Sequence, residues 1–243
     1  NAEPAVVVCA PKSLTWIQPI ADAAKVSRVY TLDEAGSGSL TDAVATQSDR
    51  HEIAQCGADD LAAILYTSGT TGRSKGAMLS HNNLLSNALT LKSYWGWSAN
   101  DVLIHALPIF HVHGLFVASH CALLSSAKMI WFSKFDPTAV IKRMPEATVF
   151  MGVPTLYVRL LANAEPARLT TEVGKNMRLF VAGSAPLLIE TFNEFRERTG
   201  HTILERYGMS ETCMLTSNPY DAKDGERRGG TVGFPLPQVQ VRV

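Results

Sequence analysis

Tyr66-Thr67-Ser68-Gly69-Thr70-Thr71-Gly72-Arg73-Ser74-Lys75-Gly76 is the most informative stretch of the sequence, and it directly follows an apolar run that is typical of a β-strand. Its five Ser or Thr hydroxyls, three glycines and one lysine supply the backbone N–H groups, side-chain donors and positive charge that a polyphosphate requires. The pattern predicts a phosphate-binding loop, although the Walker A spacing cannot be laid on it. The alternative is a flexible surface hairpin rich in Ser and Gly. The predicted phosphate ligands are Thr67, Ser68, Gly69, Thr70, Thr71, Gly72 and Lys75.

Apolar or β-branched runs alternate with helical patterns over most of the chain, which is typical of parallel βαβ units. This alternation predicts an α/β fold with mostly parallel β-sheets flanked by helices. Strands are expected at Ala5–Cys9, Arg28–Leu32, Ala62–Tyr66, Val102–Leu107, Lys128–Phe132, Thr148–Met151, Leu179–Ala182 and Thr202–Leu204.

Helix starts are marked by capping residues. Ser80 can cap one helix with its hydroxyl, and Asp136-Pro137 and Pro154 place a proline at the first helical position, where its missing N–H costs nothing. A further helix is expected from position 186. Its apolar residues Leu188, Phe192 and Phe195 recur at i, i+4 and i+7, which predicts one face packed on a sheet.

The composition is that of an ordinary globular chain. The 243 residues include 22 Lys or Arg and 22 Asp or Glu, 46% are hydrophobic and 18% are charged, which excludes a disordered chain. A net charge of zero argues against nucleic acid or an anionic membrane as a partner. No apolar stretch reaches the roughly 18 residues of a membrane span. These patterns do not determine the oligomeric state.

The cysteines indicate a reducing compartment. Cys9, Cys56, Cys121 and Cys213 are too far apart for a CxxC motif and too few for a disulfide framework. A cytoplasmic location is therefore expected. The chain begins without an initiator Met and stops inside an alternating apolar run, so we expect a piece of a longer protein.

The loop resembles the signature of the adenylate-forming enzymes, the superfamily that includes acyl-CoA synthetases, firefly luciferase and the adenylation domains of nonribosomal peptide synthetases. That signature reads Tyr-Thr-Ser-Gly-Thr-Thr-Gly-x-Pro-Lys-Gly, and Ser74 stands here in place of the usual proline. Further matches follow in the family's order at Leu107–Gly114, Gly183–Leu187, Glu205–Thr212 and Gly230–Pro235.

The resemblance implies that residues 1–243 are part of a large N-terminal, AMP-binding domain. About 1–60 would form one βα subdomain, and 61–243 would carry the phosphate loop, the acyl pocket and the adenine motifs. The small C-terminal domain of the family, with its catalytic lysine, would be absent from this chain.

The resemblance also implies roles for individual residues. Tyr207 would stack on adenine, Glu211 would bind Mg²⁺ and Thr212 would hold the α-phosphate, whereas a lone Tyr or Glu is more often a core ring or a solvated charge. The implied catalytic residues are Thr212, Glu211 and Lys75. The implied adenine-binding residues are Gly183, Ser184, Ala185, Glu205, Arg206, Tyr207 and Gly208, and the implied substrate-binding residues are His111, Arg159, Ser184 and Met209.

Two histidines flank Val112. On an extended strand, His111 and His113 would point to the same side and resemble a metal pair, but no third His or Cys lies nearby in the sequence, which disfavours zinc. The family needs only His111, as a wall and hydrogen-bond donor of the acyl site. His113 is expected to pack against the following helix or to cap it.

The carboxylate substrate is suggested by two features. Amino-acid-activating members carry an Asp shortly after the pocket motif, whereas 110–124 contains no acidic residue. The stretch 152–159 resembles members that act on malonate, in which the serine of Gly-Ser-Ala lies 25 positions after an arginine, as Ser184 does after Arg159. These two residues are expected to bind the malonate carboxylate that does not react. Alternatively, Arg159 faces solvent while Leu156 and Leu160 face inward.

The implied activity is that of an ATP-dependent acid–thiol ligase of fatty acid metabolism. It would activate malonate as malonyl-adenylate and transfer the malonyl group to coenzyme A, giving malonyl-CoA, AMP and pyrophosphate. ATP, Mg²⁺ and coenzyme A are the implied cofactors and co-substrates. Two alternatives stay open, namely a synthetase for another short- or medium-chain acid and a nucleotide-binding piece without turnover.

Overall fold

A computed structural model describes residues 2–67, 74–163 and 169–242, and these form two compact units, Asn1–Cys56 and Gly57–Val243. The first unit is a small βα arrangement. Its two strands, β1 (Val7–Cys9) and β2 (Val29–Thr31), pair in parallel. Its helices are α1 (Leu14–Ala23), preceded by a 3₁₀ turn at Pro11–Ser13, and α2 (Ser39–Val44).

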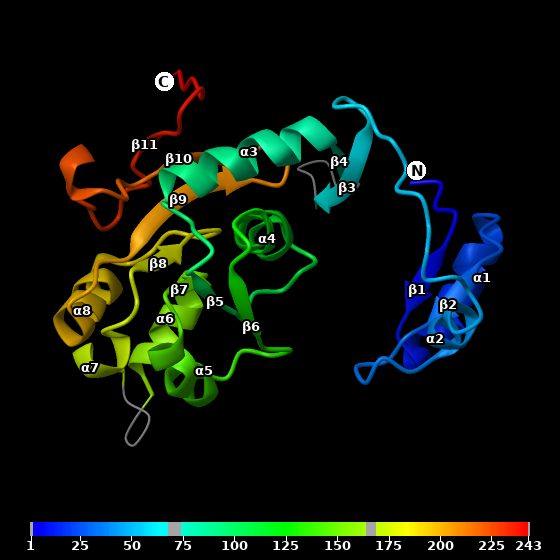
Figure 1. The fold of residues 1–243 in the computed structure, drawn as a ribbon, viewed down its shortest axis with the longest axis horizontal. Helices are drawn as coiled ribbons and strands as arrows, with labels where there is room; N and C mark the ends of the chain where they lie inside the picture. Colours follow the sequence, from blue (N-terminus) through cyan, green and yellow to red (C-terminus); the bar gives the residue numbers. More distant parts are fainter. Residues whose placement is uncertain (1, 68–73, 164–168, 243) are drawn as a thin grey trace. The chain divides into compact units, whose positions relative to one another are not determined.

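The second unit contains a seven-stranded sheet in the order β11-β10-β9-β8-β7-β5-β6 (Figure 1). The strands from β9 to β6 in this order run parallel, and β10 and β11 add antiparallel strands at one edge, so the expected mostly parallel α/β fold is confirmed. The strands are β5 (Val102–His105), β6 (Lys128–Trp131), β7 (Val149–Gly152), β8 (Leu179–Ala182), β9 (Leu204–Met209), β10 (Cys213–Ser217) and β11 (Phe234–Pro235).

Helices cover both faces of this sheet. Because β6 and β7 lie on opposite sides of β5, right-handed crossovers place α4 on one face and α5, α6 and α8 on the other. The helix α3 packs beside α4. The helices are α3 (His81–Tyr94), α4 (His120–Leu124), α5 (Pro137–Arg143), α6 (Pro154–Leu161), α7 (Thr171–Gly174) and α8 (Ile189–Thr199), with a π-helix at His113–Ser119 and 3₁₀ turns at Met144–Glu146 and Ala222–Asp224.

The predicted helix starts are confirmed at three places. Ser80 and Asn83 form a capping box at α3, in which each side chain accepts from the other residue's backbone N–H. Asp136 caps α5 through the N–H of Ala139 at 2.7 Å, and Pro154 is the first residue of α6.

The helix expected from position 186 begins later than predicted. Residues 183–188 form the turn after β8, and α8 starts at Ile189 with Leu188 as its N-cap residue. Phe192 and Phe195 are buried as expected, whereas Leu188 is 65% exposed. Placing Leu188 on the buried face was therefore wrong, because Leu188 ends the turn after β8 and precedes the first residue of α8.

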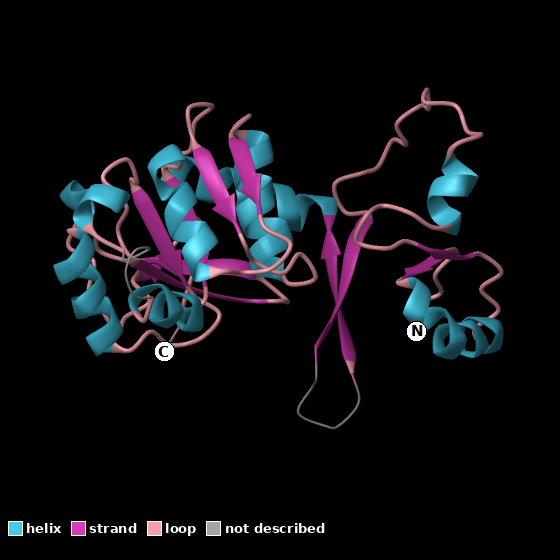
Figure 2. Cartoon of the chain, turned by 90° about the horizontal axis from the view of Figure 1, so that it is seen from below, coloured by secondary structure: helices cyan, strands magenta, loops and turns pink. Residues whose placement is uncertain are grey.

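The strands β3 (Leu61–Thr67) and β4 (Lys75–Ser80) pair with each other in a separate antiparallel hairpin. Figure 2 shows them as two crossing strands. Thr67 and Lys75 are the last paired residues of the two strands, and the Thr67 hydroxyl lies 3.5 Å from the Lys75 carbonyl. The predicted phosphate ligands Ser68, Gly69, Thr70, Thr71 and Gly72 lie outside the described residues.

Aromatic rings fill the core between the sheet and α6 and α8. Phe150, Tyr157, Phe195 and Phe180 form a chain of edge-to-face contacts with ring centroids 4.8 to 5.6 Å apart. Tyr157 is fully buried, and its hydroxyl donates to the Val181 carbonyl at 2.7 Å. Packing of this kind holds the carboxyl ends of β7 and β8, where the polar residues described below gather.

A largely buried ion pair lies at the amino ends of β5 and β8, at the other edge of the sheet from the polar residues described below. Arg178 donates from Nε and Nη2 to the two carboxylate oxygens of Asp101 at 2.7 and 2.8 Å, and from Nη1 to the Trp95 carbonyl and the Tyr220 hydroxyl. Asp101 also accepts from Thr148 at 2.8 Å. Four segments of the second unit therefore meet at one pair of charges.

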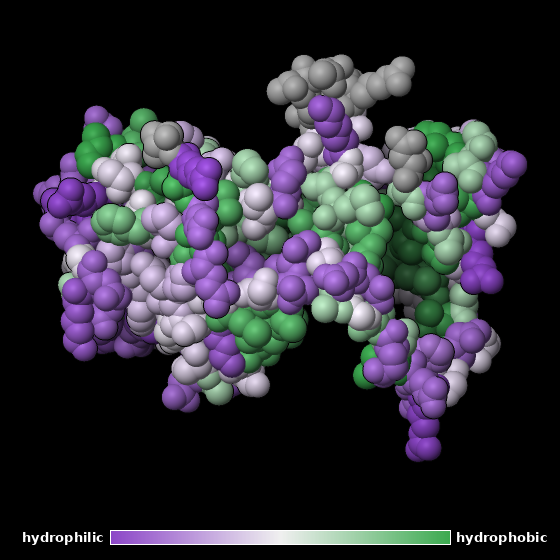
Figure 3. Space-filling model, turned by 90° about the horizontal axis from the view of Figure 1, so that it is seen from above, coloured by the Kyte–Doolittle hydropathy of each residue, from purple (hydrophilic) through white to green (hydrophobic). Residues whose placement is uncertain are grey.

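The surface mixes hydrophilic and hydrophobic side chains over the face seen in Figure 3. No helix within the described ranges is both long enough and apolar enough to cross a membrane. All four cysteines are free thiols, and Cys56 is the exposed one.

Candidate active site

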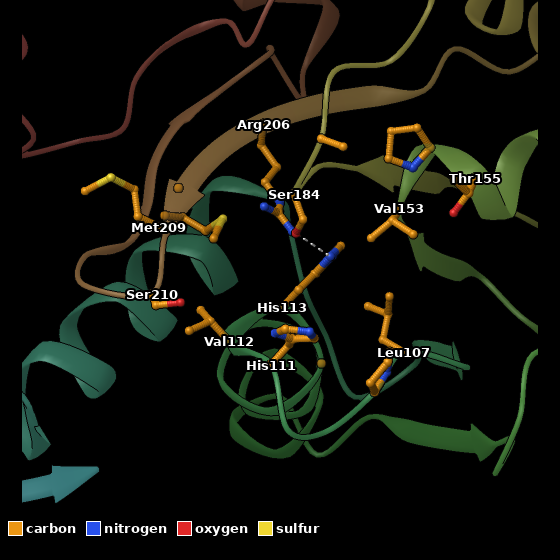
Figure 4. A pocket seen from close by; sticks show the side chains of 16 residues that line it. Leu107, His111, Val112, His113, Val153, Thr155, Ser184, Arg206, Met209 and Ser210 are labelled. Carbon is orange, nitrogen blue, oxygen red and sulfur yellow. Dashed lines mark hydrogen bonds between the residues drawn. The ribbon is translucent and has the colours of Figure 1, made fainter. Parts of the chain in front are cut away.

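A pocket of about 520 Å³ opens at the carboxyl ends of the parallel strands. The sheet order reverses between β5 and β7, and ligands of open α/β sheets bind at such a switch point because the following loops diverge there. Figure 4 shows side chains from the β5–α4 connection, the β7–α6 and β8–α8 turns and the end of β9 around this pocket. The lining residues are Leu107, Pro108, His111, Val112, His113, Gly114, Val153, Pro154, Thr155, Ser184, Ala185, Arg206, Gly208, Met209, Ser210 and Met214.

Arg206 places a buried positive charge at this pocket. Its side chain extends from β9, and the residue is only 2% exposed. Among the described residues, none accepts a hydrogen bond from its Nε or Nη2 atoms. Burial lowers the pKa of Arg206 to about 10, so the guanidinium stays charged at neutral pH. A buried, charged and partly unpartnered guanidinium is costly to the fold, and an anionic ligand would offset that cost.

The Arg206 side chain lies directly against the backbone of Gly183. A Cβ atom at position 183 would lie 2.6 Å from the guanidinium carbon, closer than real Cβ contacts come. Glycine is therefore required at the end of β8 for the guanidinium to reach the pocket. The resemblance implied adenine binding for both residues, and the structure places Arg206 at the wall of this pocket.

Ser184 and His113 face the same space as Arg206. The Ser184 hydroxyl lies 3.4 Å from Nδ1 of His113, and the dashed line in Figure 4 marks this contact. Ser184 has a backbone φ of 71°, an uncommon value for a residue other than glycine, which points its side chain into the pocket.

The His113 ring is neutral at physiological pH. The residue is 4% exposed, and its Nε2 has no hydrogen-bond partner among the described residues. Burial lowers the pKa of His113 well below its ordinary value, and the charges of Arg206, His105 and His111 add to this effect. A neutral imidazole here can donate or accept a proton in a hydrogen bond without adding a second buried charge.

His111 and His113 do not lie on an extended strand. His113 is buried and also lines the pocket, and its expected role in packing against or capping the following helix stays a prediction. His111 lies in a bend after β5, and His113 begins the π-helix, so both rings reach the pocket although they are not neighbours on a strand. π-Helical turns recur at functional sites. Within the described ranges, no group of three His, Cys, Asp or Glu residues is arranged to hold a metal ion.

Arg159 does not line the pocket. It is exposed on α6, its guanidinium carbon lies 4.7 Å from the centre of the Phe135 ring, and it donates to the Phe135 carbonyl at 3.4 Å. Leu156 and Leu160 of the same helix are buried. The expected partnership of Arg159 with Ser184 is not formed in this structure, because 3.6 residues per turn direct position 159 away from the inward face of α6. A role for Arg159 in malonate binding stays a prediction.

The turn between β9 and β10 carries the residues implied for the nucleotide. Glu211 and Thr212 are exposed there, and both border a second cavity of about 260 Å³ whose opposite wall is the polar side of α3. The Asn87 carboxamide of α3 pairs in both directions with the backbone of Met214, at 2.8 and 3.2 Å. This pairing anchors the end of the turn to α3.

Tyr207 and Glu205 alternate with Arg206 on β9. Tyr207 lies inside β9 opposite Thr216, because this strand extends beyond the expected range Thr202–Leu204. Its side chain remains partly exposed. Glu205 is buried and accepts from the Gly230 N–H at 2.8 Å. Burial raises the pKa of Glu205, while backbone N–H groups of Gly230 and Leu187 lower it in part. Its carboxylate thus ties β9 to neighbouring loops.

Of the substrate-binding residues that the resemblance implied, His111, Ser184 and Met209 meet at one pocket. The contribution of Arg206 and His113 to that pocket was missed. A signal was available, because side chains alternate along a strand, so Arg206 must point to the face opposite Glu205 and Tyr207. His113 carried no comparable signal, since a π-helix leaves no periodic pattern in seven residues.

The chain belongs to the family of AMP-binding enzymes, because the family model with that description matches residues 1–243. It is 42% identical over 195 residues to the mitochondrial malonate–CoA ligase of Mus musculus, which covers 75% of this chain and 33% of the mouse protein. ATP-bound MatB from Rhodopseudomonas palustris has a TM-score of 0.91 at 56% identity, covering 98% of this chain and 46% of that one. A malonyl-CoA ligase in a ternary product complex with methylmalonyl-CoA and AMP has a TM-score of 0.77 at 31% identity, covering 98% and 48%. The chain thus spans a third to a half of the length of these relatives.

Proposed function

We propose that the protein is an ATP-dependent acid–thiol ligase that converts malonate, ATP and coenzyme A into malonyl-CoA, AMP and pyrophosphate. The kinship with malonate–CoA ligases supports this proposal. The observation that carries it is the buried Arg206 guanidinium: the residue lines the pocket, and its Nε and Nη2 atoms have no hydrogen-bond partner among the described residues. A cytoplasmic location and a place in fatty acid metabolism are parts of the same proposal.

Malonate has two carboxylates, and the pocket treats them differently. The carboxylate that does not react would accept hydrogen bonds from Arg206 and Ser184, with the neutral His113 as a further partner. A guanidinium can meet both oxygens of one carboxylate at once. The reacting carboxylate must keep its electron density to attack the α-phosphate of ATP, so it would lie away from Arg206. Attack forms the bond between carboxylate and phosphorus and releases pyrophosphate.

The residues around the β9–β10 turn fit a nucleotide and its metal. Tyr207 offers a partly exposed ring for stacking on adenine, and Thr212 offers a hydroxyl to the α-phosphate. Glu211 fits Mg²⁺, because it is an exposed carboxylate on a turn and hard cations prefer oxygen ligands. Mg²⁺, when bound, neutralises phosphate charge. Lys75, exposed at the start of β4, would pair with the same phosphates.

A third cavity suits the thiol substrate. It has a volume of about 560 Å³, is lined mainly by apolar residues, and shares Leu107, Pro108 and Val153 with the acyl pocket. An extended thiol chain entering there would reach the acyl carbon without crossing the nucleotide. The thiol would then displace AMP, because adenylation has made AMP a good leaving group.

Exchange of labelled pyrophosphate into ATP, measured with the full-length protein and a panel of acids, tests the proposal. Malonate should support exchange at least tenfold better than acetate, propionate or medium-chain acids. A preference for a monocarboxylate would contradict the malonate assignment, and no exchange with any acid would favour a nucleotide-binding protein without turnover.

Replacing Glu211 with Gln should raise the Mg²⁺ concentration for half-maximal exchange by roughly tenfold, because the amide keeps the shape but loses the charge that attracts the cation. A magnesium titration at saturating ATP and malonate measures this. Glu226→Gln is the control, because it removes one negative charge from an exposed residue in the loop after β10. It should leave the magnesium titration unchanged. An unaltered titration for Glu211→Gln would exclude this residue as a metal ligand.

Replacing Lys75 with Ala should raise the KM for ATP roughly tenfold or more while the thermal midpoint stays within about 2 °C, since an exposed lysine contributes little to stability and much to phosphate charge. Steady-state exchange at varied ATP, alongside a thermal melt, measures both. An unchanged KM for ATP would show that the lysine does not contact the phosphates.

A further inference from the structure

His105 is a buried histidine that the proposed reaction does not use. It is the last residue of β5 and is 1% exposed. Its ring stacks on Trp131, the residue opposite it on β6, with centroids 4.0 Å apart and planes at 23°. A purely apolar ring would satisfy this stacking, so the polar ring of His105 requires a separate explanation.

Within the described residues, the hydrogen bonds of the His105 side chain go to the π-helix. Its Nε2 lies 3.0 Å from the Gly114 carbonyl oxygen and 3.1 Å from the Ser119 hydroxyl, which itself donates to the Gly114 carbonyl at 2.9 Å. A carbonyl can only accept, so the hydrogen of His105 resides on Nε2. Burial lowers the pKa of His105, which keeps this ring neutral.

Gly114 follows His113, and its position leaves no space for a side chain. A Cβ atom at 114 would lie 2.3 Å from the Pro108 carbonyl oxygen, so the chain between 108 and 114 folds tightly back on itself. The first turn of the π-helix therefore has two constraints. The Pro108 backbone packs against one side of Gly114, and the donors of His105 and Ser119 hold its carbonyl.

We propose that His105 is a positioning residue for the acyl pocket. By donating to the Gly114 carbonyl, it sets the direction of the π-helical turn and thereby holds the His113 ring beside Ser184 and Arg206. This inference rests on the proposed activation of malonate at that pocket. His105 does not touch the substrate, so its loss should weaken malonate binding without altering the nucleotide site.

The test compares His105→Leu, which keeps the volume without a donor, with His105→Gln, whose amide nitrogen can donate over a similar reach. The KM values for malonate and ATP are measured by pyrophosphate exchange in the full-length protein, and each variant is melted thermally. His105→Leu should raise the KM for malonate roughly 3- to 10-fold, the effect of one hydrogen bond, and leave the KM for ATP within twofold. His105→Gln should restore the KM for malonate to within about twofold of wild type.

Ile104→Ala is the matched control, because Ile104 is a fully buried neighbour on β5 that makes no polar contact with the π-helix. It should lower the thermal midpoint without changing the KM for malonate. If His105→Leu fails to fold, Ser119→Ala replaces it, and the KM for malonate should then rise about twofold to threefold.

Three results would overturn the inference. The first is an unchanged KM for malonate in folded His105→Leu, or in Ser119→Ala where that variant replaces it. The second is an equal change of the KM for malonate in His105→Leu and His105→Gln. The third is an equal increase of the KM values for malonate and for ATP. Malonate activation by the wild-type protein distinguishes a failure of this inference from a failure of the proposed function. If wild type does not activate malonate, the function falls and this inference with it, whereas malonate activation that is insensitive to His105 overturns the inference alone.

Discussion

Arg206→Met should lower kcat/KM for malonate by roughly 10²- to 10³-fold in pyrophosphate exchange without destabilising the fold. The free carboxylate of malonate would enter the acyl pocket with no cationic partner, and removing one member of a buried ion pair costs about 3–5 kcal/mol. Each 1.4 kcal/mol corresponds to about a factor of ten. Propionate lacks the second charge and should lose much less or even gain.

Stability separates a binding role for Arg206 from a structural one. The guanidinium is buried, and two of its nitrogen atoms find no hydrogen-bond partner in the part of the chain that the structure describes. An apolar side chain of similar length should therefore leave the free energy of unfolding unchanged or raise it. Urea denaturation of the unliganded protein measures this. A structural arginine would instead show lost stability and equal losses of activity for malonate and propionate.

Two further variants sharpen the Arg206 comparison. Arg206→Lys should restore activity only in part, because an ammonium cannot form the two parallel hydrogen bonds of a guanidinium. Arg159→Met is the matched control, since that arginine is exposed and lies over Phe135 outside the pocket. It should leave exchange with malonate within about twofold of wild type. A large, malonate-specific loss in Arg159→Met would restore the assignment made from the sequence.

Asp101→Ala should lower the free energy of unfolding by about 3–5 kcal/mol, because it leaves the largely buried Arg178 guanidinium without its charged partner. Urea denaturation followed by circular dichroism measures the change. Glu146→Ala removes the exposed ion pair with Arg143 and should cost about 1 kcal/mol or less. Equal effects of the two substitutions would show that the buried pair contributes no more than a surface pair.

The same pair predicts a dependence of stability on pH. Burial acts to raise the pKa of Asp101, but hydrogen bonds from Arg178, Ser98 and Thr148 and the Arg178 charge lower it overall. A carboxyl whose pKa is depressed by folding stabilises the native state above its unfolded pKa. This contribution is lost as pH falls through the depressed native pKa. In Asp101→Ala, the free energy of unfolding should therefore fall less steeply than in wild type as the pH is lowered through the acid range.

Secondary structure was predictable where local patterns and tertiary packing agree. The capping residues Ser80, Asp136 and Pro154 begin helices as their chemistry predicts, because satisfying a helix end is a local event. The start of α8 was misplaced because Leu188 matches the helical repeat but belongs to the turn after β8. Hydrophobic periodicity does not distinguish a helical residue from an apolar residue that ends a turn.

The sequence alone determined the α/β alternation and the segments that carry polar chemistry, because strand patterning, helix caps and glycine-rich turns are written within a few residues of one another. Only the tertiary structure decided which arginine lies at the pocket. Arg159 and Arg206 are equally charged in the sequence, but the turn of α6 directs Arg159 outward, while the side-chain alternation of β9 and the missing Cβ of Gly183 admit Arg206. Burial and unpaired donors arise only when segments distant in the sequence pack together, so no local pattern contains them.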